Sequence, residues 1–303
     1  MKIISFPSEN FNERACFSAT VAPLKPKDSS LFSLQSPSFL QTFSEGKNTF
    51  NQKTPTTEDA VRLLVFHSME TQDIEESLFL LTDKKSGVSA HYLIDGNGTV
   101  YCLVDEEKRA WHAGVAAWRE WNTDINSVSI GIEFQNTKAQ GFTSAQIDSG
   151  IRLSKEILKR HPLIKPVNIV AHSDIAPLRK KDPDEHFPWR QLAQNGIGLW
   201  TQNQRPVKDA YLQKTEEELL LKIGYLLSDS FLCADTKKTP SFSFETKKAF
   251  LTAFCRRFSP ENLTTFLEKA QEEPSESLTV YSTPTLFNRL AAVAELYDSC
   301  ESL

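Results

Sequence analysis

Three short apolar runs, rich in β-branched and aromatic residues, constrain the fold of this chain more than any other feature. They occupy residues 61–67, 128–135 and 167–170. Runs of this length and composition are typical of buried strands. Two further runs, residues 89–95 and 99–104, flank Gly96-Asn97-Gly98. This turn sequence predicts an antiparallel hairpin, because Gly and Asn tolerate a positive φ. We therefore expect a central β-sheet.

A helix is predicted between the second and third runs. Thr143 and Gln146 have the spacing of a capping box, so the helix should begin directly after Thr143. Residues on one face then repeat at helical spacing: Ile147, Ile151, Ser154 and Leu158. The basic residues 159–161 suit the negative end of the helix dipole. Strands that alternate with helices predict an α/β fold, with a mixed central sheet flanked by helices.

The composition changes after residue 200, and we expect two domains. Residues 1–200 hold the predicted strands. Residues 201–209 are polar and include Pro206, which suits a linker. Helical patterns follow over residues 216–227, 244–258 and 285–297. They predict a small C-terminal all-α domain of three helices, residues 210–303, which is long enough to bury its own core.

Composition also excludes two classes of protein. The formal net charge is -5 and no basic stripe stands out, so we expect no nucleic-acid partner. No run reaches the roughly 20 apolar residues of a membrane span, so no integral membrane segment is expected. The five cysteines are widely spread without a CxxC pair, as free thiols in a reducing compartment would be. If Met1 is the native start we expect a cytoplasmic monomer; the alternative is a periplasmic or cell-envelope location.

Two histidines that end predicted strands, His67 and His172, are candidate metal ligands. Together with Asp182, in the loop after His172, they would supply two nitrogens and one oxygen. That is the ligand set of a catalytic zinc, which keeps one coordination position open for water. Asp174 is the alternative third ligand, although it is better placed to orient a neighbour through a hydrogen bond. A histidine that ends a strand is more often structural, so spacing alone leaves the metal centre open.

Five ordered motifs extend this pattern. They are Leu-Leu-Val-Phe-His at 63–67, Val-Ser-Ala-His-Tyr at 88–92, Ala-Trp-His-Ala-Gly at 110–114, Ser-Ile-Gly-Ile-Glu at 129–133 and His-Ser-Asp-Ile-Ala-Pro-Leu-Arg-Lys-Lys-Asp-Pro at 172–183. Together they resemble the zinc-dependent N-acetylmuramoyl-L-alanine amidases, the family shared with peptidoglycan recognition proteins. Residues 8–14 resemble the opening Ser-x-Asn-x-x-x-Arg segment of this family. This implies that residues 15–57 are partly an insertion.

The resemblance assigns roles to individual residues. It makes His67, His172 and Asp182 the ligands of one Zn²⁺, Glu133 a catalytic carboxylate and Lys180 its cationic partner. Glu133 would orient or deprotonate a zinc-bound water, and Lys180 would stabilise the oxyanion that develops on the amide carbonyl. The simpler alternatives are a rim carboxylate paired with an arginine and a solvated loop lysine.

Two residues of the third motif region are expected to contact substrate. His112 lies within Trp-His-Ala-Gly, and Arg109 precedes it. For His91, a structural role is favoured.

The chain departs from the family pattern at three places. Ser68 follows the metal histidine where an aromatic residue or Asn is common, Leu178 stands where Gly is usual, and residues 184–186 replace a Gly-Pro-x segment. None of these removes a ligand, but a Leu in place of Gly restricts φ and adds bulk near the metal.

The C-terminal helices resemble, more faintly, the three-helix peptidoglycan-binding module of some of these amidases. Residues 223–225 and 246–260 carry the resemblance. Cys255 stands where that module has Gln, and its Gly-x-x-Asp turn is missing. Sugar binding and a purely structural role are both open for this domain.

The resemblance implies hydrolysis of the bond between the lactyl group of N-acetylmuramic acid and L-alanine in peptidoglycan or muropeptides. The substrate could be the intact sacculus, released fragments or their anhydro form. The alternative is a recognition protein that binds the same ligand without turnover. A structural protein with an incidental histidine cluster is the weakest interpretation.

Overall fold

A mixed sheet forms the centre of the N-terminal part of the chain. The computed structural model describes residues 1–14, 41–42, 61–137, 141–201, 206–227, 242–272 and 283–301. Within these residues the order of the seven strands is β3 (Gln41–Thr42), β1 (Ile3–Ser5), β6 (Val100–Cys102), β5 (Tyr92–Ile94), β8 (Ser129–Asn136), β4 (Leu63–Glu70) and β9 (Ile169–Ala171). β5, β8, β4 and β9 run parallel, whereas β5 and β6 form an antiparallel pair. The predicted α/β class and the hairpin are confirmed.

Several of the predicted strands differ from the structure at their ends. The two hairpin strands are shorter than the predicted runs, Tyr92–Ile94 and Val100–Cys102. β4 continues past His67 to Glu70, because its last residues keep pairing with β8 as far as Asn136. The third run begins with a 3₁₀ turn, η1 (Pro166–Asn168), and its strand begins only at Ile169. Pro166 has a fixed φ and no N–H to donate, which favours the first position of such a turn over a strand.

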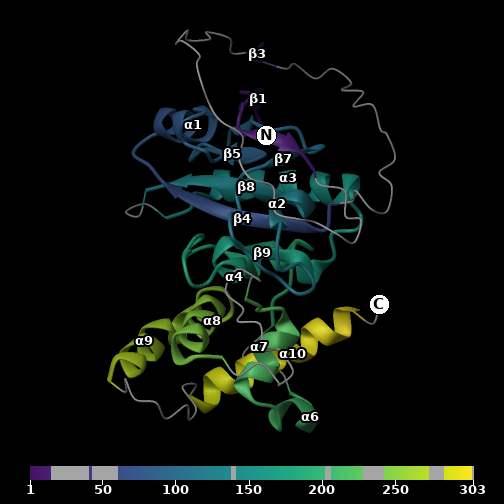
Figure 1. Cartoon of the computed structure of the whole chain (residues 1–303), viewed down its shortest axis with the longest axis vertical. Helices are drawn as coiled ribbons and strands as arrows, with labels where there is room; N and C mark the ends of the chain where they lie inside the picture. Colours follow the sequence, from purple (N-terminus) through teal and green to yellow (C-terminus); the bar gives the residue numbers. More distant parts are fainter. Residues whose placement is uncertain are drawn as a thin grey trace.

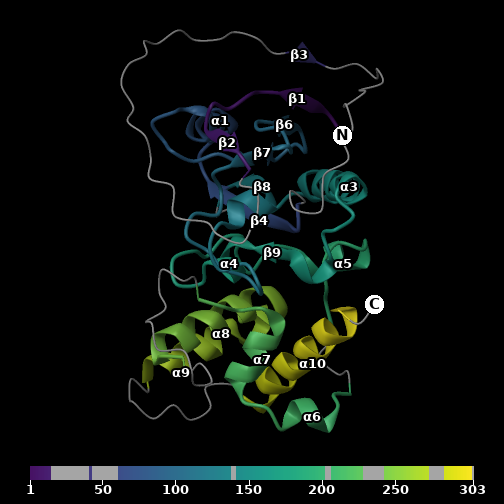
Figure 2. The same cartoon turned by 45° about the vertical axis from the view of Figure 1, so that its right-hand side comes forward.

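Helices cover both faces of this sheet. They are α1 (Ile74–Thr82), α2 (Ile125–Val128), α3 (Ser144–Arg160), α4 (His172–Ile175) and α5 (Trp189–Gln194). Leu64 and Phe66 of β4 pack in one core with α3 and α5, whereas Leu93 of β5 packs with α1 on the opposite face. Figure 2 shows α1 and α4 on one side of the strands and α3 and α5 on the other. A separate antiparallel pair joins β2 (Phe11–Glu13) to β7 (Lys108–Ala110).

The predicted cap of α3 forms only in part. Thr143 Oγ1 accepts a hydrogen bond from the Gln146 N–H, as expected. The Gln146 side chain, however, does not return to the cap. It donates instead to the carbonyls of Ile94 and Gln135 in the sheet, and so ties the start of α3 to β5 and β8.

The described residues of the C-terminal part of the chain, from 206 onwards, are mostly helical. Its helices are α6 (Asp209–Leu212), α7 (Glu216–Ile223), α8 (Phe244–Phe258), α9 (Leu263–Glu272) and α10 (Pro284–Glu301), with a 3₁₀ turn, η3 (Pro260–Asn262). The predicted helices correspond to α7, α8 and α10; α6 and α9 were not predicted. Figure 1 shows this group beyond the β9 edge of the sheet. Among the described helices, none combines the length and the apolar character that crossing a membrane requires.

One hydrophobic core joins the two parts. Leu63 and Val65 of β4 belong to the same buried cluster as Leu220, Phe254 and Leu290 of the C-terminal helices. The domain boundaries at 200 and 210 remain a prediction. Of the predicted insertion at 15–57, only residues 41–42 lie within the described part of the chain.

Candidate metal centre

The alternation of side chains along the parallel strands places the site on the sheet face that carries α1 and α4. His67 in β4 is in register with Glu133 in β8, so both side chains point to this face. β9 is the neighbour of β4 on its other side, and His172 follows it directly as the first residue of α4. Asp182 arrives from the loop after α4. The Ser173 N–H donates to the Asp182 carbonyl at 2.8 Å and closes that loop.

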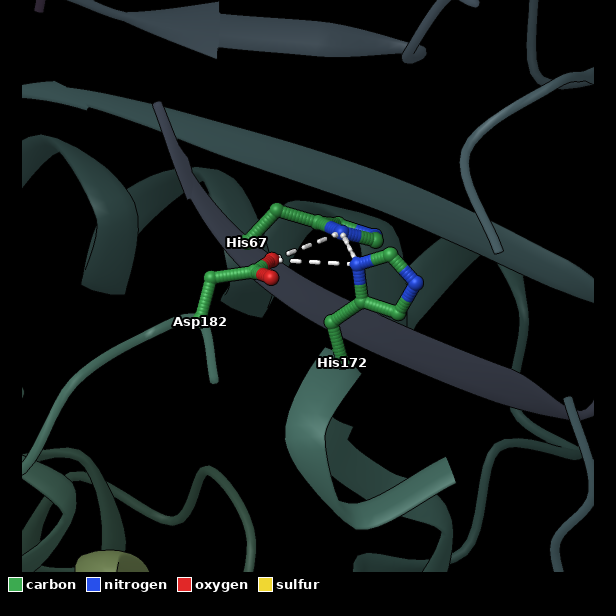
Figure 3. Close-up of side chains that lie close together, drawn as sticks. All are labelled: His67, His172 and Asp182. Carbon is green, nitrogen blue, oxygen red and sulfur yellow. Dashed lines mark hydrogen bonds and ion pairs between the residues drawn. The ribbon is translucent and has the colours of Figure 1, made fainter. Parts of the chain in front are cut away.

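Three side chains of this face converge on one point (Figure 3). His67 Nδ1 lies 2.9 Å from His172 Nδ1. Asp182 Oδ2 lies 3.4 Å from His67 Nδ1 and 3.0 Å from His172 Nδ1. Atoms at these separations can all lie about 2 Å from a single ion in tetrahedral geometry. Among the described residues they form the one His, Cys and carboxylate group compact enough to hold a metal.

Hydrogen bonds behind His67 determine which of its nitrogens faces the metal position. The Ser129 hydroxyl donates its only hydrogen to the Ile125 carbonyl, so it accepts from His112 Nε2–H at 3.1 Å. His112 Nδ1 must then accept from His67 Nε2–H at 3.0 Å. The lone pair of His67 therefore lies on Nδ1, the atom that faces His172 and Asp182.

His172 is oriented in the same way by the backbone. Its Nε2–H donates to the Ala113 carbonyl at 3.1 Å, which leaves the Nδ1 lone pair facing Asp182. Burial, together with the neighbouring His172, lowers the pKa of His67 to about 4, so this imidazole is neutral near pH 7. Neutral imidazoles are the form that binds a metal.

Glu133 completes the group. Its Oε1 lies 3.9 Å from His67 Nδ1, and its Oε2 is buried with no hydrogen-bond partner among the described residues. Burial and the charge of Asp182 raise the pKa of Glu133 well above its usual value, and the charge of Lys180 opposes this shift. A buried carboxylate oxygen without a partner is rare. Its position beside the three ligand atoms fits a water or an ion there.

Lys180 and Arg179 extend from the loop that carries Asp182. Lys180 is half-buried. Arg179 donates to the carbonyls of Ala113 and Val115 at 2.6 and 2.7 Å, which fixes this loop against the segment after His112.

The comparisons with known proteins bear on the same residues. The family model described as N-acetylmuramoyl-L-alanine amidase matches residues 57–185. The N-acetylmuramoyl-L-alanine amidase AmiD of Escherichia coli is 43% identical over 193 residues, which cover 54% of this chain and 67% of AmiD. The chain belongs to the N-acetylmuramoyl-L-alanine amidase family.

Two further comparisons concern relatives whose name or title includes an anhydro sugar. The 1,6-anhydro-N-acetylmuramyl-L-alanine amidase AmpD of Haemophilus influenzae is 42% identical over 104 residues, 34% of this chain and 56% of that protein. A solved complex of AmiD with the substrate anhydro-N-acetylmuramic acid-L-Ala-D-gamma-Glu-L-Lys matches with a TM-score of 0.59 and 32% identity. It covers 80% of this chain and 92% of AmiD in that structure.

The two predicted substrate-binding residues, His112 and Arg109, lie in different surroundings: one is buried beside the metal position and the other is in β7. His112 is buried, and both its ring nitrogens are engaged by His67 and Ser129. Arg109 in β7 donates to Asp124 at 2.7 Å and to Asn12 at 3.2 Å. Substrate contact by His112 and Arg109 remains a prediction.

The sequence did not predict that Ser129 would orient His112. Gly131, two residues later in the same strand, did indicate a crowded place beside it. A Cβ at Gly131 would lie 2.6 Å from His112 Cγ. A glycine inside a strand often marks such a close approach. His91, predicted to be structural, accepts from the Gly131 N–H and contacts the Lys108 carbonyl.

Proposed function

We propose that this amidase hydrolyses the amide bond between the lactyl group of N-acetylmuramic acid and L-alanine of the stem peptide, with one Zn²⁺ held by His67, His172 and Asp182. The observation that carries the proposal is the convergence of three ligand atoms within 3.4 Å of one another beside a buried, unpartnered Glu133 oxygen. A zinc ion bound there would polarise the scissile carbonyl and lower the pKa of a water in its open position.

The chain's own residues supply the proton transfers. Glu133, whose raised pKa lets it hold a proton, takes one from the attacking water and returns it to the leaving amine of L-alanine. Lys180 offers a positive charge to the oxygen of the amide carbonyl as negative charge develops on it. His67 and His172 keep the orientation that the hydrogen bonds with Ser129, through His112, and with Ala113 impose on them.

We further propose that the substrates are released muropeptides, including the 1,6-anhydro form. The support is the similarity to AmpD, whose name specifies the 1,6-anhydro sugar, and to AmiD, whose solved complex holds an anhydro-muropeptide. The cytoplasmic location and the monomeric state remain predictions.

The test is to incubate the protein with an anhydro-muropeptide and to follow the free stem peptide by chromatography. Wild-type protein should release peptide, a chelator should stop the release and added zinc should restore it. Glu133→Gln should lower kcat by about 10² to 10⁴, the usual contribution of a general base. His172→Ala should lose both zinc and activity.

A matched control separates the metal ligand from histidines in general. His186 lies in the same region of the chain, and its side chain is 72% exposed. His186→Ala should therefore keep zinc and activity. If zinc-loaded wild-type protein binds muropeptide but releases no peptide, the chain is a recognition protein and the hydrolase proposal fails.

A further inference from the structure

Asp174 lies two residues after His172, but its carboxylate turns away from the metal position. Its Oδ2 accepts a hydrogen bond from the Ala171 N–H at 2.9 Å. Ala171 is the last residue of β9, and His172 begins α4 directly after it. The Asp174 carboxylate therefore fixes the turn at which the chain leaves the sheet, and this turn carries the metal-facing imidazole.

Two residues from the C-terminal part of the chain hold this carboxylate. The Tyr225 hydroxyl, just after α7, donates to Asp174 Oδ1 at 2.7 Å. Arg257 of α8 donates through Nη1 to Asp174 Oδ2 at 2.5 Å, and through Nη2 to the Ile169 carbonyl at 2.7 Å. Figure 2 shows α8 next to α4. Asp174 is thus bound to two residues that lie more than fifty positions away in sequence.

The setting of this pair is apolar. The Arg257 and Asp174 side chains are 1% and 0% exposed. The Arg257 guanidinium lies 4.4 Å from the centre of the Trp189 ring and 4.7 Å from that of Phe258. Desolvation cancels much of the attraction in such a buried pair, so apolar side chains of similar size would stabilise the fold about as well. What the pair adds is a fixed orientation of the turn after β9, because each hydrogen bond requires a defined geometry.

We propose that Tyr225 and Arg257 are positioning residues for the metal centre: through Asp174 they hold α4 so that His172 Nδ1 stays beside His67 and Asp182. This inference rests on the proposed zinc function. It gives the C-terminal part of the chain a defined task at the active site. None of these residues touches substrate or metal; they act through the backbone that carries His172.

The sharpest test removes one hydroxyl. Tyr225→Phe keeps the ring and loses only the hydrogen bond to Asp174. Zinc affinity, measured by competition with a chromophoric chelator, should fall about 10-fold, the lower end of the effect of partners behind a metal ligand. Tyr297→Phe is the matched control, because Tyr297 is also fully buried but its hydroxyl has no hydrogen-bond partner among the described residues. This variant should bind zinc as tightly as wild type.

A second pair of variants separates positioning from stability. Arg257→Met leaves Asp174 buried without its cation. Lys247→Met does the same to Glu216, which pairs with Lys247 at 2.7 Å inside the helical part, both being 4% exposed. Both variants should lower the Tm, but only Arg257→Met should weaken zinc binding, by about 10-fold or more. If Arg257→Met does not fold, the Tyr225→Phe comparison decides alone.

The outcomes distinguish this inference from the proposed function. If wild-type protein takes up no zinc, the proposed function has failed. The positioning role is then tested by hydrogen exchange in the metal-free protein. Tyr225→Phe should raise the exchange rate of backbone amides 171–176, and Tyr297→Phe should not. If wild-type protein binds zinc and Tyr225→Phe binds it as tightly, the positioning role is wrong.

Discussion

At the scale of single residues, each imidazole in this site depends on a hydrogen bond on the far side of its ring. His67 donates to His112, and His172 donates to the Ala113 carbonyl. These bonds decide which nitrogen keeps a lone pair, and so whether the histidine can bind an ion at the shared point. The chain of donors behind His67 ends at Ser129, whose hydroxyl donates to the backbone.

Replacing Ser129 by alanine should therefore weaken zinc binding. The His112 Nε2–H would lose its acceptor in a buried position, and the tautomer that leaves His67 Nδ1 free would no longer be fixed. We expect the Kd for zinc to rise about 10-fold, measured by chelator competition at constant pH. Ser154→Ala is the control, since this buried hydroxyl has no partner among the described residues. Equal zinc affinities for the two variants would contradict the relay.

The sequence predicted the candidate ligands but not the residues behind them. His67, His172 and Asp182 were candidates because their types match a metal's needs and both histidines end strand-like runs. The family resemblance then assigned them as the ligands. The partners Ser129 and Ala113 are ordinary residues whose contacts arise only when separate segments pack together. No pattern of spacing marks a serine that accepts a hydrogen bond from an imidazole.

At the scale of secondary structure, the parallel register of β4, β8 and β9 brings the candidate ligands together. The apolar runs predicted these strands because a short run rich in β-branched and aromatic residues is a strong local signal of a buried strand. Their ends were less predictable. β4 continues to Glu70 because β8 pairs with it along its whole length, which is a tertiary effect. For the same reason the Gln146 side chain leaves the predicted capping box for the sheet.

The basic end of α3 has a partner that its sequence did not predict. Glu106 accepts hydrogen bonds from Arg160 at 2.7 Å, from His161 at 2.8 Å and from Tyr92 at 2.6 Å. Although burial disfavours a charged carboxylate, these bonds lower the pKa of Glu106 far below its usual range. The last turn of α3 is thereby attached to the loop between β6 and β7.

This attachment predicts a pH dependence of stability. A carboxyl whose pKa is lower in the folded chain contributes stability above its unfolded pKa of about 4.3, and this contribution is lost as the pH falls. Glu106→Gln should therefore reduce the free energy of unfolding by about 1.5–3 kcal/mol near pH 7, the range for hydrogen bonds to a charged group. The difference from wild type should shrink below about pH 4.

Urea unfolding from pH 3 to pH 8 would measure this difference. Glu156→Gln serves as the control, because Glu156 pairs with Lys159 on the exposed side of the same helix. That pair should contribute nothing measurable at any pH. A constant difference between Glu106→Gln and wild type across the range would mean that the carboxylate charge is not what stabilises the loop.

At the scale of the whole molecule, the described helices of the C-terminal part share their core with the sheet. Helix α8 is buried around most of its circumference from Phe250 to Phe258. One side packs within the helical part, and another faces α4 and the β9 edge, where Arg257 reaches Asp174. The sequence predicted helices here from their period, but a period cannot tell which second surface a helix will cover. A separate domain was therefore the natural expectation, and only the packing places Leu63 and Phe254 in one cluster.

A shared core predicts that the two parts unfold cooperatively, whereas two independent domains could unfold separately. If the helices unfolded first, they would expose the apolar side of β4 and release Asp174 from Arg257. Unfolding of the helices would therefore destabilise the sheet as well. We expect one urea transition, with the same midpoint by tryptophan fluorescence and by far-ultraviolet circular dichroism. Phe254→Ala removes a fully buried ring from this core and should lower the free energy of unfolding by about 3–5 kcal/mol. The midpoints of both curves should therefore move together to lower urea concentration. Two separated transitions, of which Phe254→Ala moves only one, would instead establish the boundary at residues 201–209 as a true linker between independent domains.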